Sequence, residues 1–263
     1  MKKKAVNITF NSLHEMSDWI ERTPRTERGE QYERSTEESA KYRKFAGTDS
    51  FAEADNLLKF GDDENAKKIQ AAHANVKATP GVSERNRLYN SPCGFLPIVP
   101  RVLAGVPENM LNIRKEEYRS TKVINVIYNT AVDYRVSAKE IIKTSASVAS
   151  AINTLEKNGY RVNLYAANFT DMRDEPVSIM VKIKDAGQYF DGLRVAYPLV
   201  NPSFLRRHIF AVLERMPEIH LTGSYGIIMS DDDTVKYVSK DMIYLSFYKC
   251  EGKSVEDIIE LIK

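Results

Sequence analysis

The run Val123-Ile124-Asn125-Val126-Ile127-Tyr128 is compact, apolar and rich in β-branched residues, and it sets our expectation for the whole fold. A run of this kind is typical of a strand covered on both faces, as the strands of parallel sheets are. Ser137 and Glu140 follow it at the spacing of a capping box, which starts a helix. The order of strand, polar loop and helix predicts an α/β domain.

The rest of the carboxyl-terminal half repeats this alternation. Ser203 and Ser254 each stand at the start of a further stretch with helical spacing of apolar residues. Strand-like runs occupy 161–168, 177–183, 225–230 and 242–248. Strands separated by helix-length segments predict a Rossmann-like, mostly parallel sheet with helices on both faces.

The composition changes near residue 120, and we divide the chain there into an amino-terminal appendage, 1–120, and an α/β domain, 121–263. The appendage is predicted to be mainly helical, with extended segments. Its run 5–10 is strand-like and is placed to add a strand at the edge of the sheet. Prolines between residues 92 and 107 alternate with apolar residues, which we interpret as extended chain lying across a core.

Composition limits the classes of protein. Apolar residues make up 43 % of the chain, enough to bury a sizeable core. The 38 basic and 36 acidic side chains give a formal net charge of +2, which argues against binding driven by nucleic-acid phosphates. No run approaches the roughly 18 apolar residues of a membrane span, so no membrane partner is expected. Cys93 and Cys250 lie among apolar neighbours and are expected to be buried thiols of a cytoplasmic protein.

Polar loops follow several of the predicted strands. In a parallel sheet, ligands bind at the carboxyl ends of the strands, near the point where the strand order reverses. The loops 129–133, 201–203 and 230–233 should therefore converge at one edge of the sheet. The sequence predicts that any binding site of this protein lies there.

The carboxyl-terminal half resembles the von Willebrand factor A-like fold. The resemblance is carried by the first strand with its polar loop and helix, and by the late run Ile227-Ile228-Met229-Ser230-Asp231-Asp232. The run Val181-Lys182-Ile183-Lys184-Asp185 is similar to a strand end in intracellular, cobalt-chelatase-type A domains. The resemblance covers residues 121–263 and points to the degenerate intracellular members found in phages and actinobacteria.

That resemblance implies a metal-ion-dependent adhesion site, built from an Asp-x-Ser-x-Ser loop, a Thr and a later Asp. Here Asn129 replaces the leading Asp and Ala131 the first Ser. Asp133, Ser203 and Asp231 stand at the other positions, and we expect them as the ligands of a Mg²⁺ ion, the one cofactor considered. The alternative is that Asn129 and Asp231 hydrogen-bond loop backbones and start turns.

We therefore expect a non-enzymatic interaction protein, encoded by a phage and acting in the host cytoplasm, that binds a protein partner through this edge of the sheet. The resemblance makes an AAA+ ATPase a candidate partner. The expected contact residues are Asn129, Thr130, Asp133, Ser203, Asp231 and Asp232. No catalytic residue is predicted, because neither a phosphate-binding Gly-rich loop nor a Gly-x-Ser-x-Gly elbow is present.

Two other functions stay open from the sequence. The first is a nucleic-acid-associated factor, which would use the basic residues Arg101, Arg114, Lys115, Arg119, Arg206 and Arg207. The second is a Mg²⁺-dependent hydrolase that uses the aspartates 231–233. His208 follows the two arginines within a predicted helix, and we expect a helix-surface or internally bonded histidine there rather than a ligand.

Overall fold

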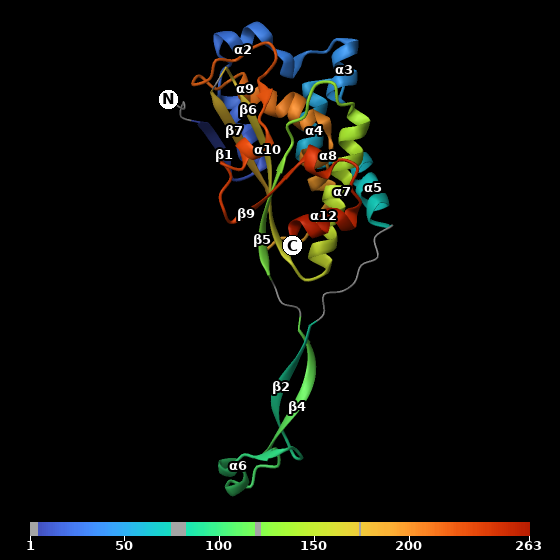
Figure 1. The fold of residues 1–263 in the computed structure, drawn as a ribbon, viewed down its shortest axis with the longest axis vertical. Helices are drawn as coiled ribbons and strands as arrows, with labels where there is room; N and C mark the ends of the chain where they lie inside the picture. The colour runs from blue at the N-terminus through green and yellow to red at the C-terminus, as the bar shows by residue number, and fades with distance from the viewer. Residues whose placement is uncertain (1–4, 75–82, 119–121, 174) are drawn as a thin grey trace.

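A computed structural model describes residues 5–74, 83–118, 122–173 and 175–263. Its centre is a six-stranded sheet in the order β1-β7-β6-β5-β9, with β8 paired to β6 (Figure 1). The strands are β1 (Val6–Phe10), β5 (Val123–Asn129), β6 (Arg161–Asp171), β7 (Pro176–Lys184), β8 (Ile227–Ile228) and β9 (Met242–Ser246). The pairs β1/β7, β5/β6 and β5/β9 are parallel, and β6 pairs in antiparallel fashion with β7 and β8. The predicted α/β fold with a mostly parallel sheet is confirmed.

Helices surround this sheet, and the predicted caps start several of them. The Ser137–Glu140 capping box is formed, and Ser254 caps the last helix together with Asp257. The longer helices are α1 (Leu13–Arg22), α4 (Phe51–Phe60), α5 (Asp63–Ala74), α7 (Ala138–Lys157), α8 (Gly192–Val200) and α12 (Val255–Ile262). Shorter helical segments are α2 (Glu27–Tyr32), η1 (Arg34–Thr36), α3 (Ala40–Ala46), the π-helical η2 (Phe204–Ile209), α9 (Phe210–Leu213), α10 (Asp231–Thr234) and α11 (Phe247–Cys250).

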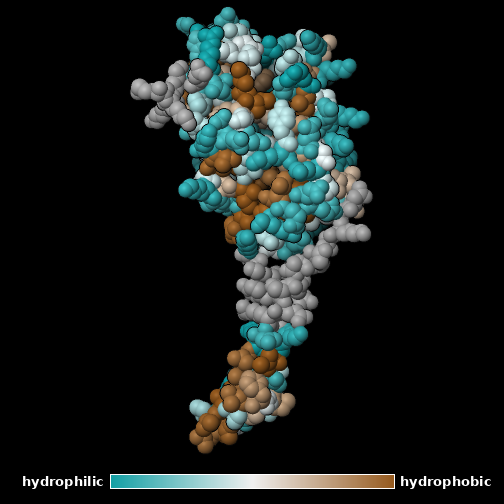
Figure 2. All heavy atoms as spheres, viewed as in Figure 1, coloured by the Kyte–Doolittle hydropathy of each residue, from teal (hydrophilic) through white to brown (hydrophobic). Residues whose placement is uncertain are grey.

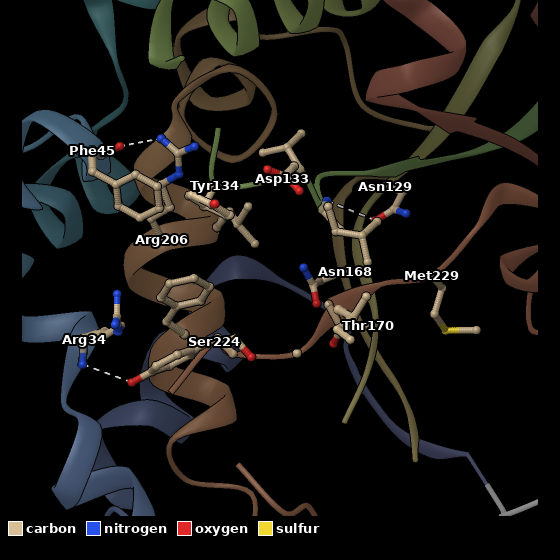
Figure 3. Close-up of a pocket in the computed structure, with 18 of the residues that line it drawn as sticks. Arg34, Phe45, Asn129, Asp133, Tyr134, Asn168, Thr170, Arg206, Ser224 and Met229 are labelled. Carbon is tan, nitrogen blue, oxygen red and sulfur yellow. Dashed lines mark hydrogen bonds between the residues drawn. The ribbon is translucent and has the colours of Figure 1, made fainter. Parts of the chain in front are cut away.

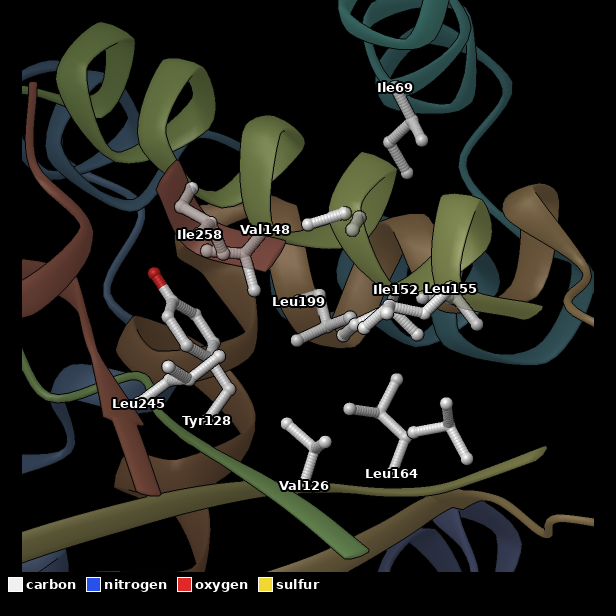
Figure 4. Packing of buried hydrophobic residues seen from close by; sticks show 14 of the residues in the cluster. Ile69, Val126, Tyr128, Val148, Ile152, Leu155, Leu164, Leu199, Leu245 and Ile258 are labelled. Carbon is white, nitrogen blue, oxygen red and sulfur yellow. The ribbon is translucent and has the colours of Figure 1, made fainter. Parts of the chain in front are cut away.

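The two faces of the sheet are covered unequally. On one face, Val126 and Leu164 pack against Ile152 of α7 and neighbouring side chains of α8 and α12 (Figure 4). Further along the same face, residues of β6 and β7 pack against α1, η2 and α9. The opposite face carries Ile127 and Phe169 and is covered by α10 and the chain around it. The core therefore lies almost entirely between one face of the sheet and the longer helices.

The segment 5–74 contributes to this core. β1 pairs with β7 over its full length, which confirms the strand expected at the sheet edge. Phe10, Met16 and Ile20 are buried among residues of β7, η2 and α9, and Ile69 of α5 packs with α7. The predicted boundary at residue 120 thus does not separate two cores, because residues on both sides of it fill the same one.

Residues 83–118 form a projection, which we call the arm. It consists of β2 (Ser83–Ser91), β3 (Leu96–Pro97), α6 (Val99–Leu103) and β4 (Met110–Tyr118), in an antiparallel sheet ordered β2-β4-β3. Figure 1 shows the arm extending away from the rest of the molecule, which we call the body.

The proline-rich segment lies in the arm, so the prediction that it crosses a core is wrong. Pro92, Pro97 and Pro100 are exposed there. Cys93 is exposed as well, against the prediction, whereas Cys250 is buried and desolvation raises the pKa of its thiol to about 12. Apolar residues between prolines indicate extended chain, but they do not indicate whether a core lies beneath it. Among the described residues, no helix has the length and apolar character needed to span a membrane.

The shared core predicts a large effect of Phe10→Ala. We expect this change to lower the free energy of unfolding by about 3–5 kcal/mol, because it leaves a cavity against β7 and η2. Phe60 is 76 % exposed, so Phe60→Ala is a matched control that should cost about 0.5 kcal/mol or less. Urea unfolding followed by circular dichroism measures both values. Equal, small effects would mean that the amino-terminal segment is not part of the cooperative core.

Candidate functional site

A cleft of about 1140 Å³ opens beside the carboxyl ends of β5 and β6 (Figure 3). One wall is the η2–α9 helix, and the other is the segment 223–231. The amino-terminal segment 34–45 and the loop after β5 complete its rim. Both polar and apolar side chains line the cleft, so it offers hydrogen bonds as well as apolar contact.

Two polar side chains of β6 form the floor of the cleft. Asn168 and Thr170 stand two residues apart on one face of the strand and are 1 % and 5 % exposed. Within the part of the chain that the structure describes, the Oδ1 atom of Asn168 and the Oγ1 atom of Thr170 have no hydrogen-bond partner. Each such buried polar atom costs about 1–3 kcal/mol when left unsatisfied. Both oxygens have almost no accessible surface in the open cleft, so an occupant that donates hydrogen bonds reaches them only if the Asn168 and Thr170 side chains turn toward it.

The segment beside this floor has an unusual backbone. Tyr225 has φ +58° although it is not glycine, and Gly226 has φ +90°. A Cβ atom on Gly226 would lie only 3.0 Å from the Cβ of Thr170, so glycine is required by both conformation and space. The hydroxyl of Tyr225 donates to Glu214 Oε1 at 2.7 Å and accepts from the backbone N–H of Arg34 at 3.0 Å. These bonds hold Tyr225 in the left-handed region.

Glu214 fastens the amino-terminal wall to the helix wall. Its side chain is fully buried at the end of α9 and accepts from the backbone N–H of Ser35 at 2.8 Å. It also accepts from Arg25 Nε at 3.0 Å. Segments almost 180 residues apart in the chain thus form opposite sides of one cleft.

Arg206 brings a positive charge to the helix wall. Its Nη1 donates to the carbonyl of Phe45, its Nη2 donates to the carbonyl of Val136 at 3.0 Å, and its guanidinium lies 3.8 Å from the centre of the Phe45 ring. Desolvation lowers the pKa of Arg206 to about 10, so the group stays charged at neutral pH. Among the described residues, no carboxylate forms an ion pair with it.

Asn129 and Asp231 meet at the side of the cleft through Tyr244. Asn129 Nδ2 donates to the Tyr244 hydroxyl at 3.1 Å, and this hydroxyl donates to Asp231 Oδ1 at 2.8 Å. Ser246 Oγ donates to the other carboxylate oxygen at 3.1 Å. Asn129 Oδ1 also accepts from the backbone of Ala131, as the turn interpretation expected. Tyr244 and Ser246 were not predicted as site residues. They stand two positions apart in β9, so the period of a strand could have indicated that they share a face.

The strand expected at 225–230 is reduced to the two residues of β8, so that part of the prediction is wrong. Gly226 turns the chain, and Ile227 is 73 % exposed rather than buried. The third strand that runs parallel to β5 and β6 is β9, which pairs with β5. Asp231 therefore reaches the site from the start of α10 rather than from a strand end.

The structure does not bring the three predicted metal ligands together at the cleft. Ser203 is buried outside the cleft, where its hydroxyl donates to the carbonyl of Ala46 at 2.7 Å. The carboxylate of Asp133 is bound by Arg135, with Nε at 2.8 Å. Within the described ranges, no three His, Cys, Asp or Glu side chains are grouped closely enough to hold an ion. Asp231, Asp232 and Asp233, which the hydrolase alternative would use, are not grouped as metal ligands in the described structure either.

The predicted contact residues are only partly brought together. Asn129, Asp133 and Asp231 line the cleft. Thr130 is half-buried next to it, and its hydroxyl donates to the carbonyl of Ala167. Asp232 is exposed beside Asp231, outside the residues that line the cleft.

The predicted basic surface is wrong for Arg206 and Arg207, which are 1 % and 0 % exposed. Arg207 is held by backbone carbonyls, including that of Thr48 at 2.9 Å. Arg101, Arg114 and Lys115 lie on the arm instead, and Arg119 lies outside the described residues. The five of these residues that the structure describes therefore do not form one surface that phosphates could contact.

His208 is the buried, internally bonded histidine that the sequence analysis expected as one of two possibilities. Its Nδ1 lies 2.6 Å from the Tyr197 hydroxyl, and its Nε2 lies 3.8 Å from Asp55 Oδ1. Desolvation lowers the pKa of His208, so it is neutral at pH 7.

A family described as a domain of unknown function (DUF7192) matches residues 1–263, and the chain belongs to that family. The match includes the arm as well as the body. No curated protein and no solved structure matches the chain.

The burial of Arg206 predicts that lysine cannot replace it. A lysine cannot bridge the carbonyls of Phe45 and Val136, so we expect Arg206→Lys to lower the free energy of unfolding by about 1–3 kcal/mol. Arg194, whose side chain is 80 % exposed, provides the control Arg194→Lys, which should leave stability unchanged. Urea unfolding measures both. An unaffected stability in Arg206→Lys would contradict the structural role.

Tyr244 predicts a specific pH dependence of stability. Desolvation raises the pKa of Tyr244 to about 12, above the value of about 10 in an unfolded chain. The raised pKa contributes stability in full below about pH 10, and this contribution is lost as the pH rises to about 12. We expect Tyr244→Phe to be less stable at pH 8 but to lose about 2 kcal/mol less than the wild type between pH 9 and 11.5. Tyr189→Phe, at an 83 % exposed position, should behave as wild type.

Proposed function

We propose that this protein is a non-enzymatic interaction module whose cleft binds a segment of a protein partner. One observation carries the proposal: the Oδ1 atom of Asn168 and the Oγ1 atom of Thr170 are buried at the cleft floor, and neither has a hydrogen-bond partner among the described residues. Buried polar groups are normally paired, and exceptions call for an explanation. The explanation proposed here is an occupant whose binding turns the Asn168 and Thr170 side chains toward the cleft and so completes these bonds.

The lining of the cleft fits a peptide. Phe45, Val132 and Phe210 provide apolar surface, and the side chains of Asn168 and Thr170 add polar groups at the floor. An extended peptide offers both backbone N–H donors and apolar side chains, as in other modes of peptide recognition. The volume of about 1140 Å³ is slightly above the usual range for small-molecule pockets, which favours a segment of several residues.

The charge of Arg206 favours an acidic group on the bound segment. A buried guanidinium bonded only to carbonyls favours a carboxylate on the partner near the helix wall. Two of the carboxylates that line the cleft are already engaged: Asp133 with Arg135, and Asp231 with Tyr244. This arrangement supports binding rather than catalysis. The resemblance to A-like domains makes an AAA+ ATPase the first partner to test.

The test uses a double variant, Asn168→Leu with Thr170→Val. Both changes keep approximate side-chain shape and remove the unpaired oxygens. We expect the melting temperature to stay equal or rise, because replacing an unsatisfied polar group by an apolar one of similar shape is neutral or stabilising. A partner captured by the tagged wild-type chain from host extract, with nuclease and about 0.15 M salt, should then bind the purified variant at least tenfold more weakly.

Ser150 provides the matched control. Its hydroxyl is also buried without a partner in the described structure, but it lies on α7, outside the cleft. Ser150→Ala should leave the affinity for the partner unchanged in titration calorimetry. Equal affinity of the double variant and the wild type would overturn the proposal. So would recovery of nucleic acid alone, lost on nuclease treatment.

A further inference from the structure

The strand register places the apolar residues of the arm on one face. Leu88 of β2 lies opposite Ile113 of β4, and Leu111 of β4 lies opposite Leu96 of β3. Residues directly opposite one another in antiparallel strands share a face, and so do residues two positions apart in one strand. These four side chains therefore form a continuous patch across the three strands, which we call the apolar face of the arm.

The other face of the arm is polar. Arg87 lies opposite Arg114, and Tyr89 lies opposite Asn112. The guanidinium of Arg114 lies 5.4 Å from the centre of the Tyr89 ring. The arm is thus an amphipathic sheet, of the kind that keeps one face in water and packs the other against a second layer.

The apolar face has no second layer. Leu88 is 56 % exposed and Leu96 is 53 % exposed, and the apolar exposure continues to the tip of the arm, where Leu103 is 83 % exposed. Figure 2 shows this concentration of apolar residues over the end of the arm. The exposed large apolar residues of the arm are Leu88, Phe95, Leu96, Val99, Val102, Leu103 and Ile113. At roughly 100 Å² each they expose on the order of 700 Å², more than the largest patch of a typical monomer.

The body does not cover this surface, because the arm extends away from it (Figure 1). A small sheet with a bare apolar face is marginally stable alone and needs a packed layer. The layer has to come from another molecule. The exposed residues of the face and of the tip together offer about 700 Å², close to the roughly 800 Å² that each partner buries in a standard stable interface.

The composition of the face selects the occupant. Its four apolar residues carry no charge, and Lys115, two positions beyond Ile113 on the same side of β4, lies at the edge nearer the body, so the apolar parts of two identical faces can oppose each other without like-charge repulsion. A two-fold interface requires a patch that complements itself, and an uncharged apolar sheet face meets that requirement. We propose that the apolar face of the arm packs against the same face of a second copy and joins two chains into a dimer.

The proposed dimer leaves the clefts open. The arm joins the body near the amino end of β5, whereas the cleft lies beside its carboxyl end. Each dimer would therefore present two clefts. The dimer stands on the arm alone and does not rest on the function proposed for the cleft, so either can fail without the other.

The first test is the mass of the chain in solution by light scattering after gel filtration. We expect a dimer for the wild type and a monomer for Leu88→Glu combined with Ile113→Glu, because the variant places charge in the interface. Phe60→Glu is the matched control: it changes an apolar side chain of the body that is 76 % exposed, and the dimer should persist. A monomeric wild type at about 100 μM, or a dimeric double variant, would overturn the proposal.

A second test separates the arm–arm dimer from insertion of the arm into the cleft of another copy. Ile227→Glu charges the rim of the cleft and should leave the dimer intact. Cys93 is exposed on the arm and Cys250 is buried, so a spin label on the folded wild type attaches at Cys93. Opposed arms should give one narrow distribution of short label-to-label distances. Loss of the dimer in Ile227→Glu, or labels too far apart to couple, would overturn the arm–arm arrangement, even if the charged arm variant simply loses its fold.

Discussion

β5 lies between β6 and β9 and pairs in parallel with both, and the rest of the structure depends on this pairing. In parallel strands the carboxyl ends share one edge of the sheet. Asn129 at the end of β5 is therefore opposite Ala167 of β6 and Ser246 of β9. That register brings the Asn129–Tyr244–Asp231 hydrogen bonds together. It also places the floor of the cleft in the part of β6 that directly follows Ala167. A one-residue slip would reverse the face on which each of these side chains lies.

The unequal cover of the sheet explains why the amino-terminal segment is part of the fold. The parallel sheet needs its apolar face buried, and the helices that follow β5 and β7 in the chain cover it only in part. β1, α1 and α5 complete the cover, with Phe10 and Ile69 in the core. The buried Glu214 then fixes the segment around Ser35 to the end of α9. The cleft results from this packing, because it lies where the amino-terminal segment meets the end of the sheet.

The molecule gives up stability in two places. At the cleft, two unpaired buried oxygens, a left-handed Tyr225 and a guanidinium without a carboxylate partner in the described structure lie within one hollow. On the arm, an amphipathic sheet stands without a second layer. Features of this kind persist in proteins where binding offsets their cost. Their separation, at opposite ends of β5, supports the assignment of different occupants to the two surfaces.

The amino-acid sequence by itself determined the elements whose signals are local. Apolar runs and serine caps located β5, β6, β7, α7 and α12, and the pattern of 5–10 located the edge strand, because periodicity and capping depend on neighbours within a few residues. Only the tertiary structure decided what covers each element. Arg206 and Arg207 were predicted to form a surface patch, yet both are buried and donate to carbonyls that are distant in the chain. The apolar segment around Phe95 read as part of a core, yet nothing in the body lies over it. Burial and pairing are set by residues that are distant in sequence, so the residues around a given position do not indicate them.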